Sequence, residues 1–349
     1  MPAGRQDSKK GSSTPSDPSV VVEHTRHLLS ISLAESTKKM YGVGWKSYVQ
    51  YCATANRKPL PLTEEALMNW ASSTALGGCK GTTIKSYLAG IRSAAIMQGF
   101  DVSDLSKMQR LKLVLRALKS IAPHTATRLP ITNDILLKIR PHMKLDTYEG
   151  KVMWAAFTFA HACLMRCGEF TTRSYKDKNF LCLAAWKWEN GAKHGTVTLP
   201  HSKTSNQPVD IYVFANGSDT CPAVAMTKYM SSRIKRRYSI RLDSPLFAME
   251  DGTPLTRKAL TKALRNALIA ARVPNAELYK GHSFRRGGAT SLARVGVADS
   301  VIKTIGRWKS HAYQLYVDID LNIMCSAAMQ VGKLKAMFGG NDVSPSMRP

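Results

Sequence analysis

The residues that could do chemistry gather in one stretch of the C-terminal third of the chain. His282 and Arg285 stand at H-x-x-R spacing in GHSFRRGGAT, and Trp308, Tyr313 and Tyr316 follow in GRWKSHAYQLYV. On a helix, residues three apart share a face, so an imidazole and a guanidinium fork can hold one phosphate. A tyrosine hydroxyl beside that phosphate can attack it once a neighbouring group takes its proton. The pattern therefore predicts phosphoryl transfer to a tyrosine.

Attack on a phosphodiester without a metal needs more groups than this stretch contains. A second arginine must help to hold the non-bridging oxygens, and a general acid must protonate the leaving oxygen. Arg166, which stands beside Glu169 in MRCGEF, is an arginine that could do the first, and Lys187, Lys193 and Lys203 (in HSKTS) are lysines that could supply the proton. An arginine that merely pairs with Glu169 and a solvated hairpin lysine remain the structural alternatives.

The elements that must position these residues lie between residues 126 and 320. The apolar run WAAFTFAHACLM predicts a helix that crosses the core, and short apolar runs separated by turn residues predict a small antiparallel sheet. His282 and Arg285 fall at the start of a helix, where the N-terminus favours an anion. The other expected helices are Asn133–Lys144, Glu149–Cys167, one from Pro222 towards Arg237 and Thr256–Ala271, and the expected strands are Asn179–Trp188, Thr196–Leu199 and Val209–Phe214.

The region from about residue 25 to 122 is helical in pattern and predicts a small bundle. We expect a helix over Lys38–Tyr51 with Ser36 as its cap, one that starts at Thr63, one from Thr82 or Thr83, and one over Asp101–Ile121. Basic residues recur on the polar sides of two of these helices, and such faces favour contact with DNA, although most are merely solvated. They are Lys38, Lys39, Lys80, Lys85 and Arg92.

The remaining segments predict little packed structure of their own. Residues 1–24 are rich in Ser, Pro, Gly and charge, which predicts a disordered basic arm. Residues 123–130 (PHTATRLP) predict a linker, because prolines bracket small polar residues. We expect a catalytic domain over 131–320 and a C-terminal helix and disordered tail over 321–349. An apolar stripe on that helix needs a partner surface, in this subunit or another.

Composition limits the classes of function. The chain has 349 residues, enough for two domains, and a formal net charge of +26, which favours a polyanionic partner such as double-stranded DNA. Seven scattered cysteines without a C-x-x-C pair predict neither a disulfide framework nor a metal site. The absence of a long apolar run argues against a membrane helix. We expect no cofactor or metal, and a location in the nucleus of a eukaryote or otherwise in the cytoplasm.

Taken together, these motifs resemble the catalytic boxes of the tyrosine recombinases, the phage-integrase family. The matching residues, in order, are Arg166 with Glu169, Lys203, His282 with Arg285, Trp308 in GRW, and Tyr316, and the resemblance covers about residues 25–338. STKKMYGVGWKSYVQYC and TIKSYLAGIRSAAIMQG are similar to DNA-contacting helices of the family's core-binding domain. The style of GHSFRRGGAT and GRWKS is most similar to recombinases of Crypton and DIRS mobile elements.

The resemblance implies a fold, a reaction and an assembly. The fold would be mainly α with a small antiparallel sheet, in a two-domain C-shaped clamp around duplex DNA. Tyr316 would form a 3′-phosphotyrosyl bond, with Arg166 holding the phosphate, Glu169 positioning Arg166, and Trp308 donating to a phosphate oxygen, without metal or ATP. Lys203 would be the general acid, with Lys193 and Lys187 as weaker candidates. Dimers on each site would join as a tetramer through the C-terminal helix. Arg257, Lys258 and Lys262, near the start of their helix, are expected to contact the major groove, and Arg286 to contact a backbone phosphate or an acidic partner.

Alternatives remain open at two points. Tyr316 lies eight residues after Trp308 and fits the family better than Tyr313, which would then be a packing residue. A type IB topoisomerase uses the same chemical groups, and a transposon-derived DNA-binding protein that has lost cleavage would share the charge. The H-x-x-R box before GRW favours the recombinase over the topoisomerase, and the complete set of candidate residues argues against loss of cleavage.

Overall fold

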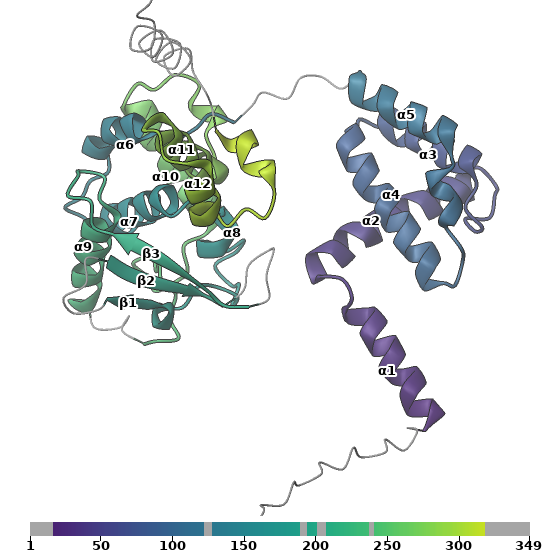
Figure 1. The fold of residues 1–349 in the computed structure, drawn as a ribbon, viewed down its shortest axis with the longest axis horizontal. Helices are drawn as coiled ribbons and strands as arrows, with labels where there is room; N and C mark the ends of the chain where they lie inside the picture. Colours follow the sequence, from purple (N-terminus) through teal and green to yellow (C-terminus); the bar gives the residue numbers. More distant parts are fainter. Residues whose placement is uncertain (1–16, 122–127, 189–193, 201–206, 237–240, 318–349) are drawn as a thin grey trace, which may run out of the picture. The chain divides into compact units, whose positions relative to one another are not determined.

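The chain divides into two compact units, Met1–Thr125 and Ala126–Pro349, which are considered separately here. The computed structural model describes residues 17–121, 128–188, 194–200, 207–236 and 241–317. Helices dominate both units, and the described strands form one three-stranded antiparallel sheet (Figure 1). The predicted fold class, mainly α with a small antiparallel sheet, is therefore confirmed. The clamp arrangement and the domain boundaries stay predictions.

The first described element, α1 (Pro18–Ile31), overlaps the predicted arm. Residues 18–24 of the predicted arm lie in this helix, and the boundary of the arm at residue 24 stays a prediction. The Asp17 side chain accepts a hydrogen bond from the Ser19 N–H, and Pro18 occupies the first turn, which together start a helix. None of the residues of α1 is buried.

Four further α-helices build the rest of the first unit. Helix α3 starts after Thr63, close to the predicted start, and the Thr63 side chain caps it by accepting a hydrogen bond from the Ala66 N–H. The expected cap at Ser36 is wrong, because α2 begins at Glu35, with Ala34, two residues before Ser36, in the capping position and no side-chain cap. The expected helix over 101–121 is split into a short 3₁₀ helix, Ser103–Ser106, and α5. The helices are α2 (Glu35–Thr54), α3 (Glu64–Leu76), α4 (Gly81–Met97) and α5 (Gln109–Ser120).

Helices α2 and α4 pack closely because each presents a glycine to the other. A Cβ atom on Gly44 would lie 2.6 Å from the Tyr87 backbone, and one on Gly90 would lie 2.6 Å from the Tyr41 backbone. Tyr48 and Trp70 fill the core beside this crossing, with their rings edge to face at 6.1 Å. The closely packed helices α2 and α4 carry the basic side chains on their exposed faces.

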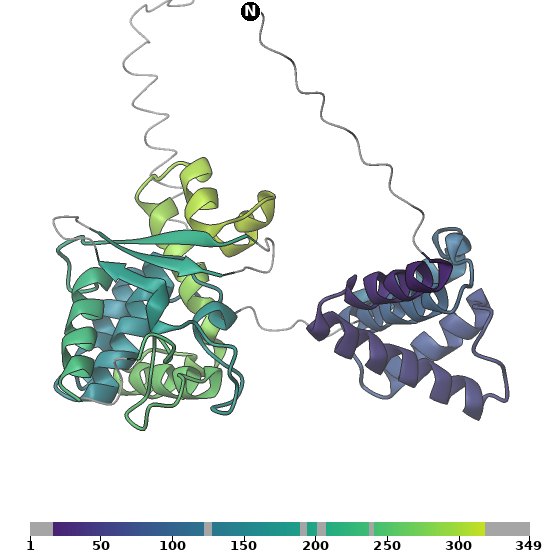
Figure 2. The same cartoon turned by 90° about the horizontal axis from the view of Figure 1, so that it is seen from below.

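The second unit contains the sheet and the remaining helices. Strand β2 lies between β1 and β3, and both pairings are antiparallel (Figures 1 and 2). The elements are α6 (Asn133–Ile139), α7 (Tyr148–Ala162), α8 (Cys167–Phe170), β1 (Trp186–Trp188), β2 (His194–Leu199), β3 (Val209–Phe214), α9 (Pro222–Ile234), α10 (Arg257–Ala270), α11 (Gly281–Arg294) and α12 (Asp299–Gly306), with 3₁₀ helices at Arg140–His142, Leu183–Ala185, Ala276–Leu278 and His311–Tyr316.

Helix α7 is the centre of this unit, as its apolar sequence predicted. Most of its residues are buried, and it packs against α9 and α11. The inner face of the sheet, represented by Val197, Ile211 and Val213, belongs to the same core. Burial of this apolar surface is the main stabilising term for the unit, and it fixes where α7 ends and α8 begins.

His161, near the end of α7, gives the unit a predictable dependence on pH. Burial lowers the pKa of His161 from 6.5 to about 4, while its Nε2 lies 3.4 Å from the Ser291 hydroxyl. The unfolded chain therefore binds a proton at His161 more readily than the folded chain does. The stability that neutral His161 contributes is fully present above pH 6.5 and declines as the pH falls towards 4. Urea titrations should show a loss of up to about 1.4 kcal/mol per pH unit in that window.

The matched control for this prediction is His142, which is exposed in the same unit. His161→Gln should flatten the decline between pH 6.5 and 4, whereas His142→Gln should leave it unchanged. An equally steep decline in the His161 variant would contradict the assignment.

No helix among the described residues is both long and apolar enough to cross a membrane.

Candidate functional site

Arg166 is the residue that precedes the short helix α8, where the chain turns after the apolar core segment. Its side chain donates to Glu169 Oε1 at 2.9 Å, and its backbone N–H donates to Glu169 Oε2 at 2.8 Å. The Glu169 carboxylate thus accepts both bonds from Arg166 and caps the first turn of α8. The Arg166 side chain is 19% exposed and that of Glu169 is 8% exposed, so the ion pair is held at the edge of the core.

His282 and Arg285 lie in the first turns of α11, as their spacing predicted. At the start of the helix the Lys280 backbone N–H donates a hydrogen bond to the Ser283 hydroxyl. The Ser283 carbonyl accepts a hydrogen bond from the Ile131 N–H at 2.9 Å. His282 is exposed, whereas Arg285 is only 1% exposed. The two side chains are therefore one turn apart but differ greatly in access to solvent.

The guanidinium of Arg285 is held by backbone carbonyls. Its Nη1 donates to the Leu164 carbonyl and its Nη2 to the Gly306 carbonyl, each at 2.5 Å, while Nε is buried without a partner. Burial, and then the charge of Arg166, lowers the pKa of Arg285 to about 9. The group stays cationic at neutral pH, with N–H capacity still available for an anion.

Trp308 and Tyr316 both lie on this guanidinium. The Arg285 Cζ is 4.0 Å from the centre of the Trp308 ring and 5.6 Å from that of Tyr316, and the two rings are 5.3 Å apart. Such cation–π contacts are worth about 2 kcal/mol when desolvated. The structure therefore brings together the predicted nucleophile Tyr316, the GRW tryptophan and the arginine predicted to bind phosphate.

The other tyrosine, Tyr313, occupies a different environment. It is 3% exposed, packs in a small core with Leu164 and Ile302, and donates its hydroxyl hydrogen to Asp299. The hydrogen bond to Asp299, followed by burial, raises the pKa of Tyr313. A raised pKa disfavours the phenolate that attack requires, so the geometry favours Tyr316.

Further arginines surround His282. The His282 side chain is exposed at the surface but partly desolvated by its neighbours, and this desolvation lowers its pKa. The charges of Arg128, Arg257, Arg285 and Arg166 lower the pKa further, in that order. Glu169 is the acidic group that acts on Arg285 within this cluster. An excess of cations held around one imidazole creates a site for an anion, and it keeps His282 neutral near pH 7.

Two of these arginines have surroundings that no local sequence pattern indicates. Arg128 stands in the predicted linker and was not singled out, but the bond between Ile131 and α11 brings the segment to His282. Arg257, a predicted DNA contact, is exposed, and a Cβ atom on Gly168 would lie 2.9 Å from its Nη2. It therefore lies close to the turn that carries Arg166, and its contact with DNA stays a prediction.

Arg307 is a second residue that the sequence did not single out. Its Nη2 donates to Glu169 Oε2 at 2.8 Å, and its Nη1 donates to the carbonyls of Ile305 and Cys163 at 3.1 and 3.3 Å. The residue belongs to the GRW box, but its acidic partner is 138 positions away in sequence. No local pattern could reveal that pair.

Several predicted residues cannot be placed. Lys203, the expected general acid, and its alternative Lys193 lie outside the described residues, as does the C-terminal segment from 318 onwards. Lys187 is described and lies exposed on β1. Lys38 donates to Glu35, and Arg286 is half-buried. The other predicted DNA-contacting residues are exposed: Lys39, Lys80, Lys85, Arg92, Arg257, Lys258 and Lys262.

Gly306 is required by the position of Trp308. A Cβ atom on Gly306 would lie 1.6 Å from Cζ3 of the Trp308 ring, so Gly306→Ala should push the ring off Arg285. Overpacking of this kind should destabilise the second unit by about 1–3 kcal/mol, measured by urea unfolding. Gly42→Ala, in α2, is the control, because a Cβ atom there meets nothing within 4 Å. It should leave the unfolding of the second unit unchanged; an unchanged Gly306→Ala would contradict the packing argument.

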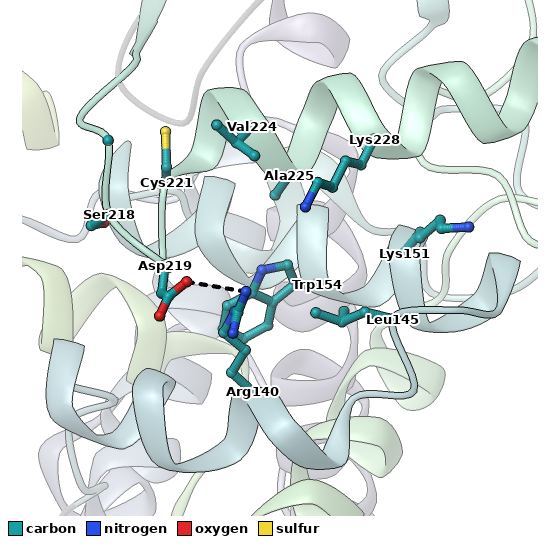
Figure 3. Close-up of a pocket in the computed structure, with 11 residues that line it drawn as sticks. Arg140, Leu145, Lys151, Trp154, Ser218, Asp219, Cys221, Val224, Ala225 and Lys228 are labelled. Atoms are coloured by element: carbon teal, nitrogen blue, oxygen red, sulfur yellow. Dashed lines mark ion pairs between the residues drawn. The ribbon is translucent and has the colours of Figure 1, made fainter.

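A separate pocket opens between α7, α9 and the segment around residue 140 (Figure 3). It has a volume of about 290 Å³, Trp154 lies among its lining side chains, and Arg140 pairs with Asp219 at 3.1 Å on one side. None of the residues discussed above lines it. Within the described part of the chain, no three His, Cys, Asp or Glu residues gather as a metal site.

Comparison with known proteins gives matches at the level of structure. No protein-family model matches the chain, and no curated protein matches it. The Tn1549 transposon integrase, in complex with transposon right-end DNA, matches with a TM-score of 0.59 and 12% identity over 90% of this chain and 98% of that one. The XerH site-specific recombinase, bound to palindromic difH substrate, matches with a TM-score of 0.58 and 16% identity over 84% and 79%. A lambda integrase dimer bound to a COC′ core site gives 0.54 and 17% over 86% and 94%.

At 12–17% identity these matches establish the fold and not the activity. They cover most of this chain and so include residues of both units. The chain therefore has the fold of the solved integrases and site-specific recombinases.

Proposed function

We propose that the protein is a tyrosine recombinase, which cuts and rejoins DNA strands through a 3′-phosphotyrosyl intermediate. The observation that carries this proposal is the contact of Tyr316 with Arg285 inside a cluster of arginines. The net charge of +26 supports a nucleic-acid partner, and the fold is shared with proteins whose structures contain DNA. Supercoil relaxation and binding without cleavage are the rival activities.

In the proposed reaction, Arg166 and Arg285 hold the non-bridging oxygens of the scissile phosphate. The Tyr316 oxygen attacks phosphorus, the bond to the 5′ oxygen breaks, and a 5′-hydroxyl leaves. Because the pKa of His282 is lowered, its neutral imidazole can accept the tyrosine proton at neutral pH. Lys203 is proposed to protonate the leaving oxygen. The covalent link conserves the bond energy, so rejoining by a 5′-hydroxyl of the partner duplex needs no ATP.

The finer points rest on the resemblance of the motifs. We propose that the enzyme serves a mobile element, with a Crypton or DIRS type as the candidate class. Dimers bound to DNA would assemble as a tetramer through the C-terminal segment 321–338, and the enzyme of a eukaryotic element would act in the nucleus. The basic faces of α2 and α4, together with Lys258, Lys262 and Arg286, are the proposed DNA contacts.

The test is a nicked suicide substrate that carries the ends of the element. Wild-type protein should form a covalent protein–DNA adduct in the presence of EDTA. Absence of an adduct on every such substrate would reject the proposal and leave a DNA-binding protein. Efficient relaxation of supercoiled plasmids that lack any element end would instead support the topoisomerase.

A further inference from the structure

The backbone conformation and the contacts of Arg307 indicate that its side chain has a specific role. It follows α12 with φ of 56°, a left-handed conformation that disfavours any residue with a Cβ atom. Its side chain is nevertheless 11% exposed and makes hydrogen bonds to Glu169, Cys163 and Ile305. Both Nη atoms are bonded and Nε is buried without a partner, and such a guanidinium at a strained backbone position points to a role for the side chain itself.

The bonds around Glu169 show what that role could be. Its Oε2 accepts from Arg307 Nη2 and from the Arg166 backbone, whereas its Oε1 accepts from Arg166 Nη1. An arginine beside a carboxylate usually binds both oxygens in a fork. Here the Arg166 guanidinium makes a single bond to Glu169, while the other oxygen is bonded by Arg307 and by the Arg166 backbone N–H.

We propose that Arg307 is a positioning residue: it holds Glu169 so that Arg166 keeps a free edge for the scissile phosphate. Glu169 carries one negative charge, whereas Arg166 and Arg307 carry two positive charges. The three side chains together therefore keep a net positive charge that attracts an anion. This inference rests on the proposed recombinase function for its catalytic consequence, but its structural part does not depend on it.

The first test measures the covalent adduct on the suicide substrate. Arg307→Gln should slow adduct formation about tenfold to a hundredfold, the size expected when a reacting group is displaced by about 1 Å. DNA binding, measured by gel shift, should change less than threefold. Arg272→Gln is the matched control, since Arg272 is also left-handed, with φ of 53°, and its exposed side chain bonds to no other described residue. It should leave the rate unchanged.

The second test separates positioning from direct contact with the phosphate. If Arg307 acts through Glu169, then adding Glu169→Gln to Arg307→Gln should restore part of the rate, because Arg166 is no longer drawn onto a carboxylate. Losses that simply multiply would overturn the proposal in favour of direct contact. If Arg307→Gln does not fold, Arg307→Lys replaces it: one ammonium can still bind Oε2, so the rate should stay within tenfold of wild type, and a larger loss would reject the role.

The third test needs no activity. A crystal structure of the Arg307→Gln protein, or of the Arg307→Lys protein if only that folds, reports the Arg166 geometry directly. In the glutamine variant both Glu169 oxygens should lie within about 3 Å of the Arg166 guanidinium; in the lysine variant the single bond should persist. The opposite geometry in either would overturn the inference. If wild-type protein forms no adduct on any DNA, the recombinase proposal fails while this structural test still stands.

Discussion

Tyr316→Phe should abolish the covalent protein–DNA adduct while DNA binding persists. The substitution removes the hydroxyl and keeps the ring, so the contacts with Trp308 at 5.3 Å and with Arg285 at 5.6 Å remain. The adduct itself contains the tyrosine oxygen, so its loss should be complete rather than partial. Trapping on the suicide substrate, followed by denaturing gel electrophoresis, measures the outcome.

The matched control is Tyr313→Phe, which also removes one hydroxyl three residues away. That hydroxyl bonds Asp299 in a small core, so its loss should reduce stability by about 1 kcal/mol and leave adduct formation in place. An adduct that survives Tyr316→Phe and disappears in Tyr313→Phe would transfer the nucleophile to Tyr313. Such a result would require the segment after α12 to rearrange on DNA.

The elements of the second unit were predicted best where a single apolar pattern decides the structure. Strand β3 begins and ends where the sequence predicted, because buried Ile211 and Val213 alternate with exposed neighbours. Helix α7 was recognised from its continuous apolar run. In both cases the residues that bury surface also define the element, so local sequence is sufficient.

The first predicted strand shows where local sequence fails. Of Asn179–Trp188, only Trp186–Trp188 pairs with β2. The backbone before it is used by a distant segment: the Leu246 N–H donates to the Leu181 carbonyl, and the Leu183 N–H donates to Ser244. One part of this apolar run therefore pairs with β2, and the other part bonds a segment more than sixty positions away. The alternation of apolar residues in the sequence does not indicate this division.

The candidate site divides in the same way. Resemblance to the recombinase boxes singled out His282 with Arg285 and favoured Tyr316 over Tyr313, because each box spans only a few neighbouring positions. Arg307 and Arg128 are recognisable only in the fold, which brings Arg307 to Glu169 and the Arg128 segment to α11. The sequence therefore indicates candidate reactive groups more readily than candidate positioning groups.

Arg285→Lys should remove most of the cleavage activity, although it keeps the positive charge. A lysine cannot form the fork that bonds two carbonyls and also presents N–H groups to a phosphate. Loss of one preorganised donor to a transition-state oxygen lowers the rate by about 10²–10³-fold. The Leu164 and Gly306 carbonyls, which Arg285 bonds at 2.5 Å, would also lose a partner, so stability should fall.

The same protein supplies a control that separates these two effects. Arg233 is also 1% exposed and bonds the carbonyls of Pro245 and Leu246, but the site described above does not include it. Arg233→Lys should therefore reduce stability to a similar extent, about 1–3 kcal/mol, with the adduct rate per folded molecule unchanged. If both variants lose the adduct in proportion to their folded fraction, Arg285 is only a structural arginine. If Arg285→Lys alone loses it, the carbonyls that bury this guanidinium are holding it in place for the phosphate.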